Sequence, residues 1–396
     1  MIVLKYWYSV DLVMIKLVFG IFALMSLCID SHAQRARDLG LKFEGKTGLN
    51  NAITDVKGVL VGYKTLVKGK GALKTGKGPV RTGVTVILPK GKSIDRVPAG
   101  WFCLNGDGEM TGTTAIEEYG FNNGAIGITN TNSVGVVRDA IGEWNIKNFS
   151  SEGHTDFSFG LPVVAETFDG LLNDINGLHV KKEDVFEALD AAQGGKIEEG
   201  NVGGGTGMSL FLYKGGSGTS SRTFKVDTAE YTLGAFIQGN FGGRQDMIIT
   251  GVPVGKLLKD DWPVINTKEK DGSIIVVIAT DAPLLPAQLK MVAKRASIGV
   301  AKTGGLGRNS SGDIFLAFST VVPIQNSKTT METWAVLPKE QLDKVYQATV
   351  QATEEAIINA LVAAKTMKGI NDNTIYAIPH KKMIDAVNNY NHLTGK

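Results

Sequence analysis

Apolar runs alternate along the chain with longer stretches in which apolar residues recur at helical spacing. The runs are short, rich in β-branched residues and bounded by polar or glycine-containing segments, which is typical of strands buried on both faces. We expect such strands at Val84–Leu88, Ala125–Ile128, Met208–Leu212, Leu233–Ile237, Ser273–Ala279 and Asp313–Ser319.

Three segments carry the helical pattern. In Pro286–Ala296 the apolar residues form one face behind a proline in the first turn, and Asp184–Ala192 follows residues typical of a helix start. The longest segment, Lys339 to about Lys365, is rich in good helix formers and has an apolar stripe suited to packing on a core. Because strands and helices alternate without a linker or repeat, the pattern predicts one layered α/β domain.

The first 33 residues differ from the rest. Lys16 precedes the apolar run Leu17–Leu27, and small residues follow at Ser31 and Ala33. A basic start, a short apolar core and a small-x-small site are the parts of a secretory signal peptide, and the run is short for a membrane span. We expect residues 1–33 to be a signal peptide cleaved after Ala33; an uncleaved anchor is the alternative.

Net charge and cysteine content indicate which binding partners and which cellular compartment to expect. The formal net charge is only +3 over 396 residues, and the basic residues are scattered, so nucleic acid is not an expected partner. Of the two cysteines, Cys28 would leave with the signal peptide and Cys103 would stand alone, which allows no intramolecular disulfide. We expect a periplasmic or secreted protein whose core is large enough to do without disulfides.

Common metal and nucleotide motifs are missing from the sequence. It contains no HExxH or paired CxxC motif, so no metal or other cofactor is expected. His154 beside Asp156 is interpreted as a pair of solvated loop residues rather than part of a triad. The glycine-rich run Gly200–Gly207 precedes a strand instead of following one, which is the wrong order for a phosphate loop. We interpret it and a second run, Gly215–Arg222, as tight connections around a buried hairpin.

The most informative stretch is Asp271-Gly272-Ser273, directly before an apolar run. Cleavage after the glycine would expose a serine that carries a hydroxyl nucleophile and, in its own α-amine, a base that titrates near neutral pH. The alternative is an ordinary turn in which the serine bonds the backbone. An N-terminal serine would also need oxyanion donors and groups that hold its amine, and suitable side chains end or open predicted strands. They are Asn240, Ser311 and Asp313.

The chain resembles the DmpA-type aminopeptidases, the S58 family, which includes L-aminopeptidase/D-amidase/esterases and β-peptidyl aminopeptidases. Asp271–Leu284 is similar to the self-cleavage site of that family, and the resemblance runs from about Leu39 to the C-terminus. Further blocks in family order are Asn51–Val56, Leu104–Gly112, Thr129–Gly135, Leu161–Thr167 and Gly200–Gly207.

The resemblance implies a four-layer αββα sandwich, similar to N-terminal-nucleophile hydrolases but with different strand connectivity. It also implies cleavage into an α chain, residues 34–272, and a β chain, residues 273–396, of the same domain. The processed αβ units are expected to form a homo-oligomer.

Residue roles follow from the same resemblance. Ser273 is the implied nucleophile, Asn240 an oxyanion donor, and Ser311 and Asp313 the groups that orient the nucleophile and its amine. The Ser273 hydroxyl would first attack the carbonyl of Gly272, and the freed serine would then form an acyl-enzyme with a peptide, amide or ester.

Two further residues match substrate-pocket positions of the family. Glu166 falls where β-peptidase members contact the free ammonium of the substrate. Phe168 falls where members carry Tyr or Trp, and because phenylalanine has no hydroxyl, Asn240 and backbone N–H groups would have to serve the oxyanion alone. The expected function is a self-processing serine aminopeptidase or amidase. The alternatives are a β-peptidyl aminopeptidase, an acyltransferase acting on amines, and a non-catalytic binding protein that stays uncleaved.

Overall fold

A computed structural model describes most of the chain beyond the N-terminal segment. The described residues are 34–150, 160–259, 261–266, 272–325 and 329–395. The chain divides into two units, Met1–Ala33, which lies outside the described residues, and Gln34–Lys396. No described helix has the length and apolar character needed to cross a membrane. The signal peptide and the interpretation of His154 and Asp156 lie outside the described residues and stay predictions.

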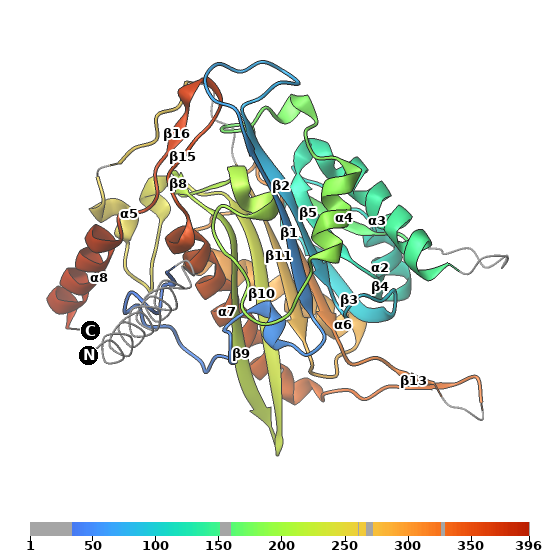
Figure 1. Cartoon of the computed structure of the whole chain (residues 1–396). Helices are drawn as coiled ribbons and strands as arrows, with labels where there is room; N and C mark the ends of the chain where they lie inside the picture. The colour runs from blue at the N-terminus through green and yellow to red at the C-terminus, as the bar shows by residue number, and fades with distance from the viewer. Residues whose placement is uncertain (1–33, 151–159, 260, 267–271, 326–328, 396) are drawn as a thin grey trace, which may run out of the picture. The chain divides into compact units, whose positions relative to one another are not determined.

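Two stacked β-sheets form the middle of the unit Gln34–Lys396 (Figure 1). The six-stranded sheet has the order β4-β3-β12-β11-β10-β9, and the four-stranded sheet has the order β1-β2-β5-β6. Neighbouring strands are antiparallel except for the parallel pairs β11–β12 and β5–β6. The bounds are β1 Leu60–Lys68, β2 Val80–Leu88, β3 Arg96–Cys103, β4 Phe121–Asn123, β5 Ile126–Asn130, β6 Val163–Thr167, β9 Gly216–Val226, β10 Ala229–Asn240, β11 Ser273–Thr280 and β12 Asp313–Ser319.

Helices cover the outer face of each sheet. Helices α6 (Pro286–Lys302) and α7 (Leu342–Ala363) pack on the six-stranded sheet, and α3 (Val134–Phe149) and α4 (Lys182–Asp190) pack on the four-stranded sheet. The four-layer αββα sandwich is therefore confirmed.

Shorter elements connect these layers. The helices are α2 Thr113–Tyr119, α5 Val254–Leu257 and α8 His380–Thr394, and the 3-10 turns are η1 Ile53–Asp55, η2 Thr131–Ser133, η3 Ile175–Gly177, η4 Gly203–Gly207, η5 Arg244–Asp246, η6 Lys339–Gln341 and η7 Ile370–Asp372. The short strands are β7 Ser209–Leu210, β8 Tyr213–Lys214, β13 Ile324–Gln325, β14 Glu332–Thr333, β15 Met367–Lys368 and β16 Thr374–Ile375.

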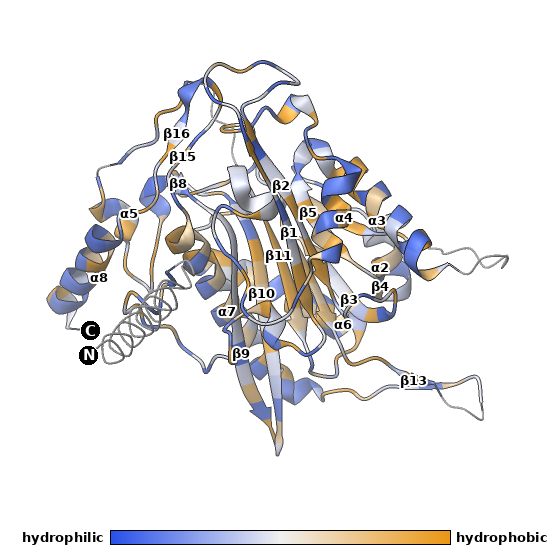
Figure 2. Cartoon of the chain, in the orientation of Figure 1, coloured by the Kyte–Doolittle hydropathy of each residue, from blue (hydrophilic) through white to orange (hydrophobic). Residues whose placement is uncertain are grey.

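The central strand β11 is apolar along its length because both of its faces are covered. Ile274, Val276 and Ile278 belong to the core shared with α6 and α7, whereas Ile275 and Val277 belong to the core between the two sheets. The central strands are accordingly among the most hydrophobic parts of the chain (Figure 2). Burial of each such side chain contributes about 1.5–3 kcal/mol relative to exposure, so β11 is held firmly from both sides.

The expected strand at Met208–Leu212 is wrong in its second half. Only Ser209–Leu210 forms a strand, because Phe211 and Leu212 have φ of 52° and 61° and make the turn of a hairpin. Leu212 is partly buried and Phe211 is fully buried, with its ring packed edge-on against Phe241 at a centroid distance of 5.1 Å. The apolar residues that suggested a longer strand therefore bury a turn.

The interpretation of Gly215–Arg222 as a tight connection is also wrong, since Gly216–Val226 is strand β9. A Cβ at Gly218 would lie 2.1 Å from the carbonyl oxygen of Ala356 in α7. The glycine therefore allows the helix to approach the strand closely. The other glycine-rich run does form a compact connection, the buried 3-10 turn Gly203–Gly207.

The segment directly after Ala33 is anchored by ion pairs between partly exposed arginines and buried carboxylates. Arg35 Nε lies 2.7 Å from Glu199 Oε2, and Arg37 Nε lies 2.7 Å from Glu355 Oε1. Glu355 also accepts a hydrogen bond from Arg222 at 2.7 Å, and both of these side chains are buried. Burial raises the pKa of Glu355, but the two arginines outweigh it and hold the pKa below the ordinary value. Glu355 therefore joins the N-terminal segment and β9 to α7.

Candidate active site

Ser273 opens β11 at the centre of the six-stranded sheet, directly opposite the last residue of β10, Asn240. The Cα atoms of such an antiparallel pair lie about 4.5–5.5 Å apart, and their side chains share one face of the sheet. Ser273 is 4% exposed and Asn240 is 5% exposed. The predicted nucleophile and the predicted oxyanion donor thus lie side by side at one end of the sheet.

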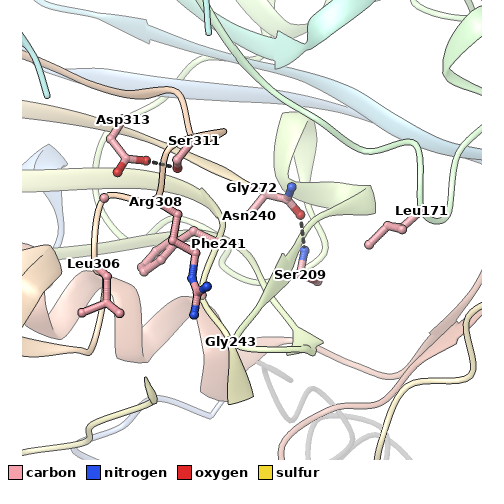
Figure 3. Close-up of a pocket in the computed structure, with 12 residues that line it drawn as sticks. Leu171, Ser209, Asn240, Phe241, Gly243, Gly272, Leu306, Arg308, Ser311 and Asp313 are labelled. Atoms are coloured by element: carbon pink, nitrogen blue, oxygen red, sulfur yellow. Dashed lines mark hydrogen bonds between the residues drawn. The ribbon is translucent and has the colours of Figure 1, made fainter. Parts of the chain in front are cut away.

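The side-chain amide of Asn240 is oriented by the backbone. Its Oδ1 accepts a hydrogen bond of 2.8 Å from the N–H of Ser209 (Figure 3). Because the oxygen is engaged, the amide nitrogen is the group that Asn240 can offer as a donor, as an oxyanion site requires. Sequence reasoning missed Ser209, since its contribution comes from a backbone N–H and leaves no side-chain signal.

A buried lysine supports the hairpin that carries Ser209. Lys214 pairs with Ser209 across the hairpin, and its Nζ donates to the carbonyl oxygens of Met208 and Gly215 at 2.7 and 2.8 Å. Burial lowers the pKa of Lys214 to about 7, against the charge of Asp169, which raises it. The two carbonyl contacts fix the chain on both sides of the turn.

Gly272 has no room for a side chain. A Cβ at this position would lie 1.5 Å from the carbonyl oxygen of Asn240 and 2.8 Å from the Cα of Phe241. The predicted cleavage bond is therefore pressed against the backbone of β10, an approach that only glycine permits.

Ser311 and Asp313 form a hydrogen-bonded pair beside the start of β11. Ser311 Oγ donates to Asp313 Oδ1 at 2.6 Å (Figure 3), and Asp313 is in register with Ile274 on the parallel strand. Burial raises the pKa of Asp313, while hydrogen bonds from Ser311, Asn105 and the backbone of Ile274 lower it, and burial prevails. A carboxyl group is thus held next to the residue that follows Ser273, where it can orient an amine.

Two cavities adjoin at Gly272. The first has a volume of about 150 Å³ and is lined by Leu171, Ser209, Asn240, Phe241, Gly242, Gly243, Gly272, Leu306, Gly307, Arg308, Ser311 and Asp313. The second has a volume of about 140 Å³ and is lined by Asp107, Gly108, Glu109, Thr131, Glu166, Phe168, Gly272, Ser273 and Ser310. All of the site residues named from the sequence line one or the other.

The second cavity is acidic. Glu166 lies near the end of β6, is buried, and accepts hydrogen bonds from the backbone N–H of Glu109 and the hydroxyl of Thr131. Asp107 and Glu109 add two further carboxyl-bearing residues to the lining, and Phe168 contributes an apolar ring. This combination suits a ligand with an ammonium group and a small apolar part.

Arg308 is a lining residue that sequence reasoning did not single out. It belongs to the first cavity, and its Nη2 pairs with Asp246 Oδ2 at 2.7 Å. Its side chain is 49% exposed. The position of Arg308 three residues before Ser311 is the one signal in the sequence that could have drawn attention to it.

Metal ligation finds no support within the part of the chain that the structure describes, where no group of three or more His, Cys, Asp or Glu side chains is placed to hold a metal ion.

Comparison with known proteins identifies the family. The family model for peptidase family S58 matches residues 51–375, which is most of the chain. The chain belongs to peptidase family S58. It is 48% identical over 387 residues to beta-peptidyl aminopeptidase BapA of Sphingosinicella microcystinivorans, a match that covers 94% of this chain and 96% of the relative.

Solved structures agree with the fold of this S58 peptidase. The L-aminopeptidase D-Ala-esterase/amidase of Ochrobactrum anthropi, described as a prototype of the serine aminopeptidases with a new variant of the Ntn hydrolase fold, superposes with a TM-score of 0.83 at 44% identity. That match covers 90% of this chain and 98% of the other. A Burkholderia sp. beta-aminopeptidase gives a TM-score of 0.81 at 41% identity, with 90% of this chain and 99% of the other covered.

This S58 peptidase is therefore a hydrolase of the aminopeptidase type with an N-terminal-nucleophile-hydrolase fold. The family, the fold and the enzyme class expected from the sequence are confirmed. The individual roles of Ser273, Asn240, Ser311, Asp313 and Glu166 stay predictions, and so does that of Phe168.

Proposed function

We propose that this S58 peptidase cuts its own chain between Gly272 and Ser273 and then releases N-terminal residues from peptides, amides or esters through an acyl-enzyme on Ser273. The observation that carries the proposal is the position of Ser273: it opens a buried central strand opposite Asn240, whose amide is oriented in advance by Ser209.

Self-cleavage proceeds in two steps. The Ser273 hydroxyl oxygen attacks the carbonyl carbon of Gly272, the C–N bond breaks as the proton lost by the hydroxyl passes to the nitrogen, and an ester now joins the two residues. Water then hydrolyses the ester, which leaves a carboxylate on Gly272 and restores the hydroxyl beside a free amine. The amide of Asn240 donates to the oxyanion that forms in each step.

Turnover uses the freed amine as the base. It takes the hydroxyl proton as Ser273 attacks the substrate carbonyl, and it returns the proton to the leaving amine or alcohol. Water releases the acyl group by the same route. Asp313, held by Ser311, orients the amine, and the carboxylate of Glu166 binds the free ammonium of the substrate's N-terminal residue.

A preference for N-terminal β-amino acids is a second candidate function. It is supported by the 48% identity to a beta-peptidyl aminopeptidase and by the similarity to a beta-aminopeptidase structure. Rates on β-alanyl and α-aminoacyl p-nitroanilides separate the two: faster turnover of the β-alanyl compound establishes the β-peptidase, and slower turnover excludes it.

We further propose that residues 1–33 are a signal peptide, that the enzyme is periplasmic or secreted, and that processed αβ units form a homo-oligomer. Support for the first point is the anchoring of Arg35 and Arg37, directly after the predicted cleavage at Ala33. N-terminal sequencing of protein from an export-competent host tests the cleavage site, cell fractionation tests the compartment, and light scattering during size-exclusion chromatography tests the assembly.

The main test is the Ser273→Ala variant, followed by intact mass and N-terminal sequencing under denaturing conditions. We expect the wild type to give two chains, one beginning at Ser273, and the variant to stay intact and inactive. Ser297→Ala is the matched control, because the Ser297 hydroxyl is exposed on α6 and bonds only the carbonyl of Lys294 among the described contacts. A cleaved or active Ser273→Ala protein would refute the proposal.

A further inference from the structure

We propose that Arg308 binds the free carboxylate of the leaving group, so that the preferred substrates of this enzyme are dipeptides rather than peptide amides. The inference rests on the proposed function, because it takes Ser273 as the nucleophile and the acidic cavity as the ammonium site. It adds the substrate class and a specificity residue on the opposite side of the reacting bond.

Each of the two cavities suits one part of a substrate, either the N-terminal residue or the leaving group. The second cavity, with Asp107, Glu109 and Glu166, suits the N-terminal ammonium. The reacting carbonyl has to lie between Ser273 and Asn240, so the leaving group extends into the first cavity, which adjoins at Gly272. Among the described residues that line this first cavity, Arg308 is the one with a cationic side chain.

The first cavity has room for a small leaving group. Its volume is about 150 Å³, well above the roughly 10–15 Å³ that a single bound water requires. A leaving group of one residue carries its carboxylate two bonds from the reacting nitrogen. A cation on the wall of this cavity can therefore meet that carboxylate, whereas a leaving group that ends in an amide offers it no negative charge.

The guanidinium of Arg308 is held in position. Its Nη2 contacts Asp246 at 2.7 Å, and Figure 3 shows the side chain pointing toward Gly243. A Cβ at Gly243 would lie 3.0 Å from Asp246 Oδ2 and 3.3 Å from Arg308 Nη2, so the pair rests closely on this glycine. A guanidinium has five N–H donors in a planar fork and can bridge two carboxylates.

The loop that carries Arg308 is tied to the catalytic end of the sheet. The carbonyl oxygen of Arg308 accepts hydrogen bonds from Asn105 Nδ2 and from the N–H of Ser311, both at 3.0 Å. Asn105 also accepts a hydrogen bond from the N–H of Asp313 at 2.7 Å. The backbone of Arg308 is thus tied to the start of β12, and the contact with Asp246 orients the side chain that extends from it.

The test compares an alanyl dipeptide with its C-terminal amide and with an aminoacyl p-nitroanilide, using the β-alanyl series if that is the one the enzyme cleaves. We expect the wild type to prefer the dipeptide. Arg308→Gln should lower kcat/KM for the dipeptide by about 10- to 100-fold, mainly through KM, and leave the other two substrates within about twofold. Arg308→Lys should keep part of the preference. Arg295→Gln, at an exposed arginine that stacks on Tyr346, is the matched control.

A uniform loss on all three substrates, or no loss on the dipeptide, would overturn the proposal. Product inhibition of the wild type gives a measurement that needs no variant: free alanine should inhibit more strongly than alanine amide, and equal inhibition would also overturn it. Cleavage into two chains and turnover of the p-nitroanilide report on the proposed function separately. Failure of those two readouts would refute the function itself rather than the role of Arg308.

Discussion

Replacement of Gly272 by alanine tests the geometry of the proposed cleavage bond most directly. The new Cβ would be 1.5 Å from the carbonyl oxygen of Asn240, whereas real Cβ atoms essentially never come within 3.0 Å of another heavy atom. The neighbour is backbone in β10 and cannot rotate away. Either β10 or the segment before Ser273 has to move by at least the 1.5 Å that separates these two values.

Such a movement has a predictable effect on the reaction. Misplacement of reacting groups by about 1 Å costs about 100-fold in rate, and here the shift separates the Ser273 hydroxyl from both its target carbonyl and the amide of Asn240. We therefore expect Gly272→Ala to slow self-cleavage by at least about 100-fold. Overpacking should also lower the free energy of unfolding by about 1–3 kcal/mol, which is too little to prevent folding of a domain this size.

The assay is the fraction of uncleaved chain against time, measured by intact mass on freshly purified protein. Gly142→Ala is the matched control, because a Cβ at this position in α3 meets nothing within 4 Å and alanine favours a helix. Near-ultraviolet circular dichroism verifies that both variants fold. Cleavage of folded Gly272→Ala at the wild-type rate would show that the contact with Asn240 does not govern the reaction, and the reasoning would fail.

Three further outcomes are expected. Asn240→Ala should lower kcat per cleaved chain by about 10²–10³-fold with KM little changed; steady-state kinetics on a p-nitroanilide, together with the cleaved fraction from intact mass, measures both, and a change in KM alone would assign it to binding. Because burial raises the pKa of Asp313, its carboxylate form is lost at a higher pH than for an ordinary aspartate as the medium is acidified, and activity should fall with it. A pH–rate profile of the residual activity of Asp313→Asn should lack this acid limb, and its persistence would point to another group. Glu355→Ala should lower the free energy of unfolding by about 3–5 kcal/mol, because it leaves the buried Arg222 unpaired; urea denaturation in the uncleaved Ser273→Ala background measures the loss, and a change below about 1 kcal/mol would contradict the argument.

The parts of the fold that the sequence predicted best are those with a continuous apolar signal. Asp313–Ser319 coincides with β12 and Ser273–Ala279 lies within β11, because strands covered on both faces need no alternation. The strand Gly216–Val226 was not predicted, because its glycines make room for α7 and the sequence alone does not show which helix will pack there.

The residues of the candidate site also differ in whether the sequence alone predicts them. Ser273 was recognisable because its neighbours form a local motif that also occurs in a known family. Ser209 and Arg308 were not, since the first acts through a backbone N–H and the second through a loop that only the folded chain brings to the cavity. Contacts that depend on tertiary structure leave little trace in the local sequence.

The order of strands in the six-stranded sheet has a consequence for the lifetime of the mature enzyme. β11 and β12 lie in the middle, with β10 and β9 on one side and β3 and β4 on the other. A cut before Ser273 would place the two middle strands on one polypeptide and their four neighbours on the other, so the pieces could separate only by losing the whole sheet. Refolding would then become bimolecular and dependent on concentration, while the uncut precursor refolds alone. The mature enzyme would therefore not refold readily once it has unfolded. Its lifetime as an active protein would be set by the rate at which it unfolds.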